Sequence, residues 1–302
     1  MTAYETRLDQ LVDRLGDIAQ RNGVLAQYSA AGVGGPADVL VVARTPADVK
    51  RAIVESRALA LPYKVFGGLS NCLVSDRGLQ GVIVLNQARD FRFADDYQIH
   101  ADSGALVIKV ARAAVARGWG GLTWAVGLPG TVGGAVINNA GAFGGETSKA
   151  LRSAVLLGPG GNVHEFTPDW FNFRYRCSRL KGAGEDWVVL TATFQLRPRD
   201  REHLQAKAAE YTQRRQRTQP PGRTLGSTFK NPEGDYAGRL IEAAGLKGTR
   251  VGSIVVSHHH ANFFINEGGG TAADYLTLIR QVQDEVERKF GIRLEPEIEL
   301  IG

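Results

Sequence analysis

The residues of this chain that most strongly suggest a ligand site are glycines, and they are concentrated between Trp124 and Glu146. The segment reads WAVGLPGTVGGAVINNAGAFGGE and has no charged residue before its final glutamate. Glycine permits positive φ and lets the main chain approach a phosphate closely, at an entropic cost that a plain surface loop has little reason to bear. Thr131, Asn138 and Asn139 add hydrogen-bonding groups. This glycine tract therefore predicts a backbone cradle for a ligand; the alternative is a run of tight turns between short buried strands.

The glycine tract follows neither of the two common phosphate-binding motifs. It contains no G-x-x-x-x-G-K-[ST], and so no lysine placed for phosphoryl transfer. GTVGGA also lacks the context of a Rossmann fingerprint. A second glycine-bearing loop, FGGLSNCLVSD at residues 66–76, follows a predicted strand and contributes Ser70 and Asn71. Two such loops in one domain indicate a long diphosphate ligand held from two sides, such as FAD.

Composition and charge restrict the class of protein. A chain of 302 residues with 43% hydrophobic content is typical of a globular protein with two domains or three small ones. The balance of 36 basic and 31 acidic residues suits anionic small molecules as readily as nucleic acid. Arg214, Arg215 and Arg217 form the densest basic cluster, but no aromatic residues interleave with it, so we expect no nucleic-acid partner.

Three further expectations concern location, the cysteines and metals. No apolar run approaches the roughly 20 residues needed to span a bilayer, and the acidic N-terminal segment does not resemble a signal peptide, so we expect a cytoplasmic protein without membrane contact. Cys72 and Cys177 show no CxxC spacing, and we expect both to be reduced. His258, His259 and His260 are consecutive; because adjacent residues of a strand point to opposite faces, we assign no metal to them.

Hydrophobic periodicity predicts the elements that must position these motifs. The expected helices lie at 4–21, 46–58, 106–118, from about 201 onward, 237–244 and 272–290. The expected strands lie at 38–43, 63–66, 82–85, 91–93, 97–102, 153–157, 163–166, 187–196, 254–256, 263–265 and 298–301. The pattern indicates an α+β domain to about residue 200, a linker at 214–224, and a second α/β unit beyond it.

Six separated motifs resemble the UDP-N-acetylenolpyruvoylglucosamine reductase family. They are GLSN, GLPGTVGGAVINNAGAFGGE, YRCS at 175–178, GSTFKNP at 226–232, SHHHANFFIN at 257–266 and LEPEIELIG at 294–302. They occur in the family's order and cover nearly the whole chain, and the chain resembles the subclass without an extra tyrosine-bearing loop. The resemblance implies an α+β fold, with an FAD-binding domain of the vanillyl-alcohol-oxidase (PCMH) type in two subdomains (1–85 and 86–200) and a C-terminal α/β substrate-binding domain (214–302).

The resemblance also implies an activity and its catalytic residues. NADPH would reduce a dissociable FAD, and hydride would pass to C3 of UDP-N-acetylglucosamine enolpyruvate, with protonation at C2, to make UDP-N-acetylmuramate for peptidoglycan. Arg176 would polarise the substrate carboxylate, and Ser227 would protonate the enol. Glu297 would complete the stabilisation as a protonated acid or through a bridging water. Taken alone, each has a structural alternative: a surface ion pair, a loop cap, and an exposed strand residue beside Glu295 and Glu299.

The remaining site residues follow from the same resemblance. Lys230, Asn231 and His260 would bind the substrate together with Arg176. Leu69 stands where the family's loop usually has glycine, so we expect the chain there to lie further from the diphosphate. The expected FAD contacts are Gly67, Gly68, Ser70, Asn71, Gly130, Thr131, Gly133, Gly134, Ala135, Asn139, Gly141 and Gly144.

Two other hypotheses stay open at this point. One is an FAD-dependent oxidase or dehydrogenase of the same fold with another substrate. The other is a nucleotide-sugar binding protein that has lost catalysis. For any of the three, we expect a monomer.

Overall fold

A computed structural model describes residues 2–181 and 186–302. The chain forms two compact units. We call N-terminal unit the part made of Met1–Arg21, Val39–Gly68 and Gly81–Arg214, and C-terminal unit the part made of Asn22–Asp38, Leu69–Gln80 and Arg215–Gly302. The chain therefore passes between the units several times, and each is described by itself. The three-part division at 1–85, 86–200 and 214–302 stays a prediction.

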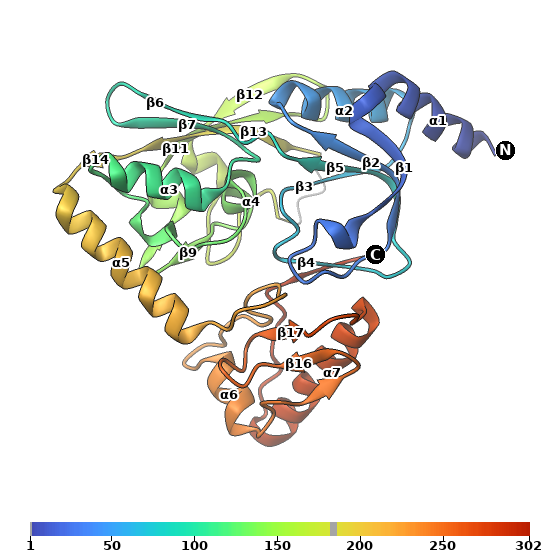
Figure 1. Cartoon of the computed structure of the whole chain (residues 1–302). Helices are drawn as coiled ribbons and strands as arrows, with labels where there is room; N and C mark the ends of the chain where they lie inside the picture. Colours follow the sequence, from blue (N-terminus) through green and yellow to red (C-terminus); the bar gives the residue numbers. More distant parts are fainter. Residues whose placement is uncertain (1, 182–185) are drawn as a thin grey trace. The chain divides into compact units, whose positions relative to one another are not determined.

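The first layer of the N-terminal unit is a sheet covered by two helices (Figure 1). Its strands have the order β1-β2-β5-β3 and span Ala19–Val24, Pro36–Ala43, Leu79–Asn86 and Tyr63–Phe66. The helices are α1 (Ala3–Leu15) and α2 (Pro46–Ala58). A capping box between Thr45 and Asp48 starts α2, and Leu11 and Ile53 join the sheet residues in one buried cluster. β3 pairs in parallel with β5, which directs the end of β3 into the first glycine loop.

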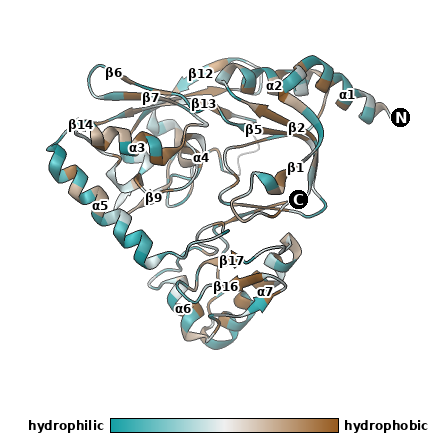
Figure 2. Cartoon of the chain, viewed as in Figure 1, coloured by the Kyte–Doolittle hydropathy of each residue, from teal (hydrophilic) through white to brown (hydrophobic). Residues whose placement is uncertain are grey.

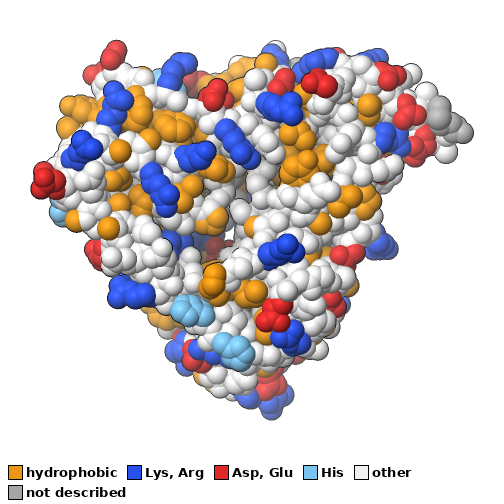
Figure 3. All heavy atoms as spheres, in the orientation of Figure 1, with side chains coloured by type: hydrophobic (Ala, Val, Ile, Leu, Met, Phe, Trp, Pro, Cys, Tyr) orange, Lys and Arg blue, Asp and Glu red, His pale blue; other side chains and the backbone are white. Residues whose placement is uncertain are grey.

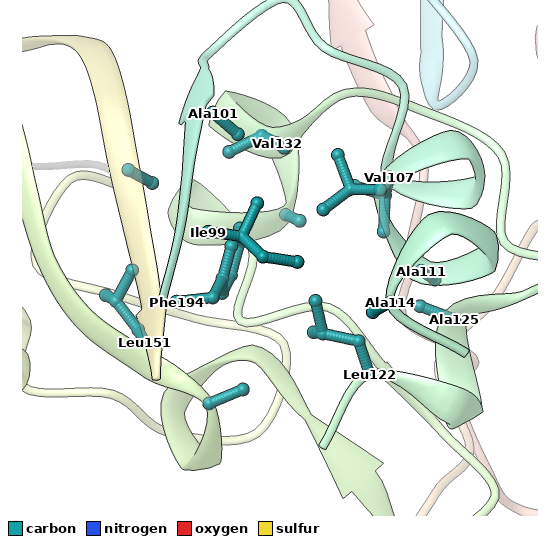
Figure 4. Close-up of a cluster of buried hydrophobic side chains, with 14 of the residues drawn as sticks. Ile99, Ala101, Val107, Ala111, Ala114, Leu122, Ala125, Val132, Leu151 and Phe194 are labelled. Carbon is teal, nitrogen blue, oxygen red and sulfur yellow. The ribbon is translucent and has the colours of Figure 1, made fainter. Parts of the chain in front are cut away.

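The second layer of the N-terminal unit is an antiparallel five-stranded sheet. Its order is β12-β11-β13-β7-β6, with bounds Val163–Phe166, Leu151–Leu157, Val188–Gln195, Gln98–Asp102 and Phe91–Ala94. The helices α3 (Val107–Ala116) and α4 (Val132–Ile137) pack against it. Ile99, Leu122 and Phe194 come together in the core between these elements (Figure 4). A small pair, β8 (Trp119–Gly120) with β14 (Arg197–Pro198), closes one edge.

Helix α5 (Arg201–Thr218) is hydrophilic along most of its length (Figure 2). Leu204 is its one fully buried residue among those described. The expected linker at 214–224 is therefore wrong in its first part, because α5 continues to Thr218 and irregular structure begins only before the two prolines. The prolines remove backbone donors and so prevent the helix from continuing.

The C-terminal unit combines two helices with short strands. α6 (Ala237–Ala243) and α7 (Ala272–Phe290) pack in a core with β15 (Arg250–Val251), β16 (Ile254–Val256) and β17 (Phe264–Asn266). β18 (Glu299–Ile301) pairs in parallel with β4 (Cys72–Val74), so the chain end is joined to the segment after the first glycine loop. Both carboxylate oxygens of Asp76 accept from the N-terminal amides of α7, at Ala272 (2.8 Å) and Ala273 (2.9 Å).

Two further observations concern the first helix, whose predicted end was wrong, and the three consecutive histidines. The helix expected at 4–21 ends at Leu15, because Gly16 takes a φ of 65° as its C-terminal cap and a strand follows from Ala19. The three consecutive histidines do not lie on a strand. The Ser257 hydroxyl accepts from the amides of His259 (3.0 Å) and His260 (3.3 Å), which makes this segment a turn.

Surface charge is mixed. Lys and Arg side chains are scattered over the face drawn in Figure 3, with acidic side chains among them. Within the described residues, neither Cys72 nor Cys177 forms a disulfide bond. Among the helices of residues 2–181 and 186–302, none has the length and apolar character to cross a bilayer.

Candidate functional site

The two glycine-rich segments meet inside the N-terminal unit. A Cβ atom added at Gly67 would lie 2.3 Å from the Thr131 hydroxyl oxygen and 2.7 Å from its methyl carbon. Only glycine can occupy position 67 while the first loop rests directly on the start of α4. The close packing supports the expectation that both segments face one ligand.

The first loop presents backbone donors suited to a diphosphate. In the described part of the chain, the amide N–H groups of Gly68, Leu69 and Ser70 have no backbone or side-chain acceptor. Consecutive N–H groups next to a left-handed residue form a concave anion site, and Leu69 is left-handed with a φ of 43°. The loop therefore offers the unsatisfied donors that a cradle for FAD phosphates requires.

Leu69 takes the backbone conformation that glycine would adopt without strain. A left-handed φ costs a residue with a side chain roughly 1–2 kcal/mol. The Leu69 side chain is only 2% exposed, so burial supplies an offset of similar size, about 1.5–3 kcal/mol. The leucine thus preserves the turn of the loop, and the expected displacement from the diphosphate stays a prediction.

The glycine tract contains a short helix that the sequence did not predict. Thr131 caps α4, accepting from the amide of Gly134 at 3.4 Å, and the Ala135 amide bonds the Thr131 carbonyl at 2.9 Å. The amides of Val132 and Gly133 donate to the carbonyls of Ala105 (2.9 Å) and Ser103 (2.7 Å). These donors are therefore already used. Glycine here serves close packing, because a Cβ at Gly133 would lie 3.0 Å from that of Ser103.

The end of the tract is a hairpin. β9 (Gly141–Ala142) pairs antiparallel with β10 (Gly145–Glu146), and Phe143 and Gly144 between them both have positive φ, 51° and 79°. Positive φ at both central residues is the requirement of a type I′ turn, which explains Gly144. The structural alternative of tight turns between short strands thus describes this part of the tract, and Gly130, with a φ of 104°, likewise serves the turn into α4.

Asn138 and Asn139 use their side chains inside the protein. Asn138 Nδ2 donates to the Gly134 carbonyl at 3.2 Å, and its Oδ1 accepts from Lys181 at 2.7 Å. Asn139 is 3% exposed, and its amide is bonded at both ends to protein groups. The expected contact between the Asn139 side chain and FAD therefore has no free donor or acceptor on which to rest.

Arg176 stands at the tip of a tight turn in the N-terminal unit. Arg174 and Cys177 bond each other's backbones at 2.9 and 3.1 Å, and Arg176 has a φ of 53°. Positive φ at the third residue of a four-residue turn is where glycine or asparagine is usual. An arginine held there carries strain of the kind that concentrates at functional sites.

The C-terminal unit brings three motifs side by side. Ser227 and Phe263 pair in an isolated antiparallel β-bridge, and the amide of Thr228 donates to the Asn262 carbonyl at 2.8 Å. On the other side, the amide of Glu297 donates to the Thr228 carbonyl at 2.8 Å. Ser227 and Glu297 are therefore held on hydrogen-bonded neighbouring segments, although seventy residues separate them in the sequence.

Asn262 is a structural residue of this site that sequence reasoning missed. Its side chain accepts from the amide of Phe229 at 2.9 Å and donates to the Phe229 carbonyl at 2.8 Å, and it is 3% exposed. The pair of bonds fixes the segment that carries Ser227. Its place inside the SHHHANFFIN motif was the available signal.

The Ser227 hydroxyl has the freedom that a proton donor needs. Ser227 is half-buried, and within the described residues its hydroxyl forms no hydrogen bond. Asn71 reaches the same region, donating to the Glu297 carbonyl at 3.2 Å and accepting from the Glu299 amide at 2.8 Å through its own carbonyl. The Ser227 hydroxyl is thus available as a proton donor, on a segment whose backbone is bonded to that of Glu297.

Lys230, Asn231 and His260 also have partners in the C-terminal unit. The Lys230 ammonium pairs with Glu295, which is largely exposed. The Asn231 oxygen accepts from the first amide of α6, Ala237, at 3.1 Å. His260 Nδ1 accepts from the Asn262 amide at 3.2 Å, which leaves the ring proton on Nε2, and burial lowers the pKa of His260. His260 is thus set up as a neutral donor.

Known proteins resemble this chain along nearly its whole length. Residues 216–301 match the family described as UDP-N-acetylenolpyruvoylglucosamine reductase, C-terminal domain, and residues 37–167 match the FAD binding domain family. The chain is 39% identical to UDP-N-acetylenolpyruvoylglucosamine reductase 2 of Symbiobacterium thermophilum, over 100% of this chain and 98% of that protein. It is 40% identical to the reductase of Rubrobacter xylanophilus, over 97% and 99% of the two chains.

A solved structure agrees with these relatives. The crystal structure of UDP-N-acetylenolpyruvylglucosamine reductase from Thermus caldophilus matches with a TM-score of 0.80 and 35% identity, over 92% of this chain and 97% of that one. With the FAD-binding match, this similarity confirms the predicted fold class: α+β, with an FAD-binding domain and a C-terminal domain.

Proposed function

The chain belongs to the UDP-N-acetylenolpyruvoylglucosamine reductase family, and from this premise we propose how it carries out the reaction. It is an FAD-dependent oxidoreductase that uses NADPH to reduce UDP-N-acetylglucosamine enolpyruvate to UDP-N-acetylmuramate for peptidoglycan synthesis. The observation that carries the assignment of roles is the hydrogen bond from the Glu297 amide to the carbonyl of Thr228, the residue next to Ser227. The expected cytoplasmic location and monomeric state belong to the same proposal.

The residues of the two glycine-bearing segments fit FAD. Gly68, Leu69 and Ser70 supply unsatisfied N–H groups for the diphosphate, and Gly67 and Thr131 bring the two glycine segments together. When bound, FAD supplies hydride-transfer chemistry between NADPH and the substrate. The donors at the start of α4 are already bonded, so we assign the diphosphate to the first loop and a shaping role to the tract.

Arg176 binds and polarises the substrate carboxylate. Its planar guanidinium can donate two parallel hydrogen bonds to a carboxylate, and its positive charge favours the extra negative charge that develops when hydride adds to C3. The left-handed turn presents this side chain at a defined angle. Orientation of this kind lowers the barrier because the charge meets a donor already in place.

Ser227 delivers a proton to C2. A serine hydroxyl is a weak acid, so the alkoxide that forms needs stabilising neighbours. Glu297, on the adjacent segment, serves as a protonated acid or through a bridging water, because a bare carboxylate there would oppose formation of the enolate. Lys230 and Asn231 bind the nucleotide diphosphate end, with Lys230 exchanging its Glu295 partner for a phosphate. His260 donates from Nε2 to the same substrate.

An anaerobic visible spectrum tests the proposed function. Purified protein reconstituted with FAD should bleach on addition of NADPH and regain its absorbance on addition of the enolpyruvyl nucleotide. A protein that takes up no FAD, or that is reoxidised only by oxygen with an alcohol or sugar as its reductant, would overturn it.

Replacing Ser227 with alanine separates the two half-reactions. The variant should be reduced by NADPH at close to the normal rate but should reduce the substrate at least about a hundredfold more slowly. Thr224→Ala is a matched control, because it removes a hydroxyl of the same unit that accepts from the Gly226 amide at 3.2 Å and lies beside Tyr275 rather than beside a residue assigned to the substrate. Equal loss of both half-reactions in Ser227→Ala would contradict the assignment of the proton donor.

A further inference from the structure

The loop that carries Arg176 is bonded along its length to the glycine tract. Three consecutive residues of the tract hold three points of the loop. Ile137 accepts from the Ser178 hydroxyl at 2.6 Å, Asn138 accepts from Lys181 at 2.7 Å, and Asn139 donates to the Arg174 carbonyl at 3.1 Å. All of these contacts lie within the N-terminal unit.

The contact made by Asn139 falls on the atom that closes the turn. The Arg174 carbonyl accepts the turn-closing bond from the Cys177 amide at 3.1 Å and also the bond from Asn139 Nδ2. A strained turn persists only where its surroundings hold it, and Arg176 sits in this one at a φ of 53°. Asn139 therefore supports the turn at the point that determines where the arginine side chain leaves the backbone.

Asn139 is itself held in a single orientation. Its Oδ1 accepts from the Ser148 amide at 3.0 Å, and its Nδ2 approaches Glu146 Oε2 at 3.4 Å. Glu146 is held in turn by the Ser148 hydroxyl at 2.9 Å. These bonds determine which end of the amide is the donor, so Nδ2 faces Arg174. The residue also has a φ of 42°, which asparagine tolerates better than most side chains.

We propose that Asn139 is a positioning residue for Arg176, acting through the Arg174 carbonyl, and that Glu146 fixes the direction of its amide. The proposal rests on the role of Arg176 in the proposed function. The proposal assigns a role to Glu146, the only charged residue of the glycine tract: it orients Asn139, which holds the turn that carries Arg176.

The test is stopped-flow kinetics of the two half-reactions in Asn139→Asp and Asn139→Gly. Aspartate keeps the acceptor for Ser148 but replaces the donor to Arg174 with a negative oxygen; glycine removes the side chain and tolerates the positive φ. In both variants, reoxidation of the reduced enzyme by the enolpyruvyl nucleotide should slow roughly tenfold to a hundredfold. Reduction by NADPH and FAD affinity should stay within about threefold, because neither depends on Arg176.

A double-mutant cycle with Arg176→Ala provides the readout that a general structural role would not move. If Asn139 acts through Arg176, Asn139→Asp should slow reoxidation no further once the arginine is gone. Asn86→Ala is the matched control. Asn86 is a buried asparagine of the same unit, bonded to Ser103 at 2.6 Å and Ala88 at 3.0 Å, and its effect should fall equally on both half-reactions.

Several outcomes would overturn the inference. Loss of FAD from both Asn139 variants would make the residue a flavin ligand. A parallel fall in both half-reactions, or independent effects of Asn139→Asp and Arg176→Ala, would reduce its role to stability. Failure of the proposed function is distinguishable from these results. In that case the unmodified enzyme would not be reoxidised by the nucleotide, or Arg176→Ala would react like the unmodified enzyme.

Discussion

Leu69 permits a sharp test of the backbone conformation in the first glycine loop. In most positions glycine destabilises a protein by about 0.5–1 kcal/mol relative to alanine, because its unfolded chain has more freedom to lose. At position 69 the φ of 43° favours glycine over alanine instead. Alanine retains the left-handed strain of roughly 1–2 kcal/mol, and glycine relieves it. We therefore expect Leu69→Gly to be more stable than Leu69→Ala by about 0.5–1 kcal/mol.

Both variants should nevertheless be less stable than the unmodified protein. The Leu69 side chain is 2% exposed, and removal of a buried leucine typically costs about 2–5 kcal/mol. When the relief of strain and the entropic penalty are included, the free energy of unfolding of Leu69→Gly should be about 2–4 kcal/mol below that of the unmodified protein. FAD affinity should change little in either variant that folds, because the donors at 68–70 are backbone groups.

Urea unfolding, measured on the FAD-free protein so that ligand binding adds nothing to the stability, gives the two free energies directly. A matched pair at an ordinary buried position, Leu40→Ala and Leu40→Gly in strand β2, should show the usual order with alanine the more stable. The reasoning is refuted if Leu69→Ala is as stable as Leu69→Gly or more so, since the strain assigned to this position would then be absent.

Other predictions follow from single contacts. Gly67→Ala should lower FAD affinity at least about tenfold, seen as lost flavin absorbance after gel filtration, because the new methyl group meets Thr131; normal flavin content would contradict it. Asp76→Ala should destabilise the protein by about 2 kcal/mol in urea and Asp76→Asn by about half of that, since the asparagine keeps one acceptor for α7; equal effects would exclude a contribution from charge. Burial raises the pKa of Tyr275 to about 12, so the stabilisation from its neutral form is fully present below pH 10, and about 2–3 kcal/mol of the free energy of unfolding is lost as the pH rises through 12. In Tyr275→Phe this part of the pH dependence of stability should disappear. An unchanged profile would refute the prediction.

Regular elements with strong local signals were predictable from the sequence. Helix α2 begins at Pro46 after a capping box, and helix α7 begins at Ala272 after Thr271 and Asp274 form another; both match the predicted bounds to the residue. Strand β3 likewise lies at 63–66 as predicted. Local caps and periodicity contain the information that such elements need, because their hydrogen bonds join near neighbours in the chain.

The site was predictable only in part, because its geometry depends on contacts between distant segments. Nothing around Ser227 indicates that Asn262 brackets its neighbour Phe229, or that the backbone of Glu297 joins Thr228. Helix α4 was missed for another reason. Its sequence, VGGAVI, has a low intrinsic preference for helix, and it forms because its first amides find carbonyls from a different loop.

Left-handed residues explain why the conformation of the functional loops was not predictable, although their motifs were recognised. Leu69, Asn139 and Arg176 all have positive φ, and all lie in the motifs that resemble those of the reductase family. Periodicity describes side chains on regular backbones and contains no signal for a single residue of opposite handedness. Each of the three lies where a hydrogen-bond donor is presented. Leu69 lies among the backbone N–H groups of 68–70, the Asn139 amide donates to Arg174, and the Arg176 guanidinium stands at the tip of a turn. Leu69 is held by burial, and Arg176 by the bond that Asn139 makes to its turn. Strain at these positions is thus matched by a specific contact, which is why the effect of replacing Asn139 should depend on the presence of Arg176.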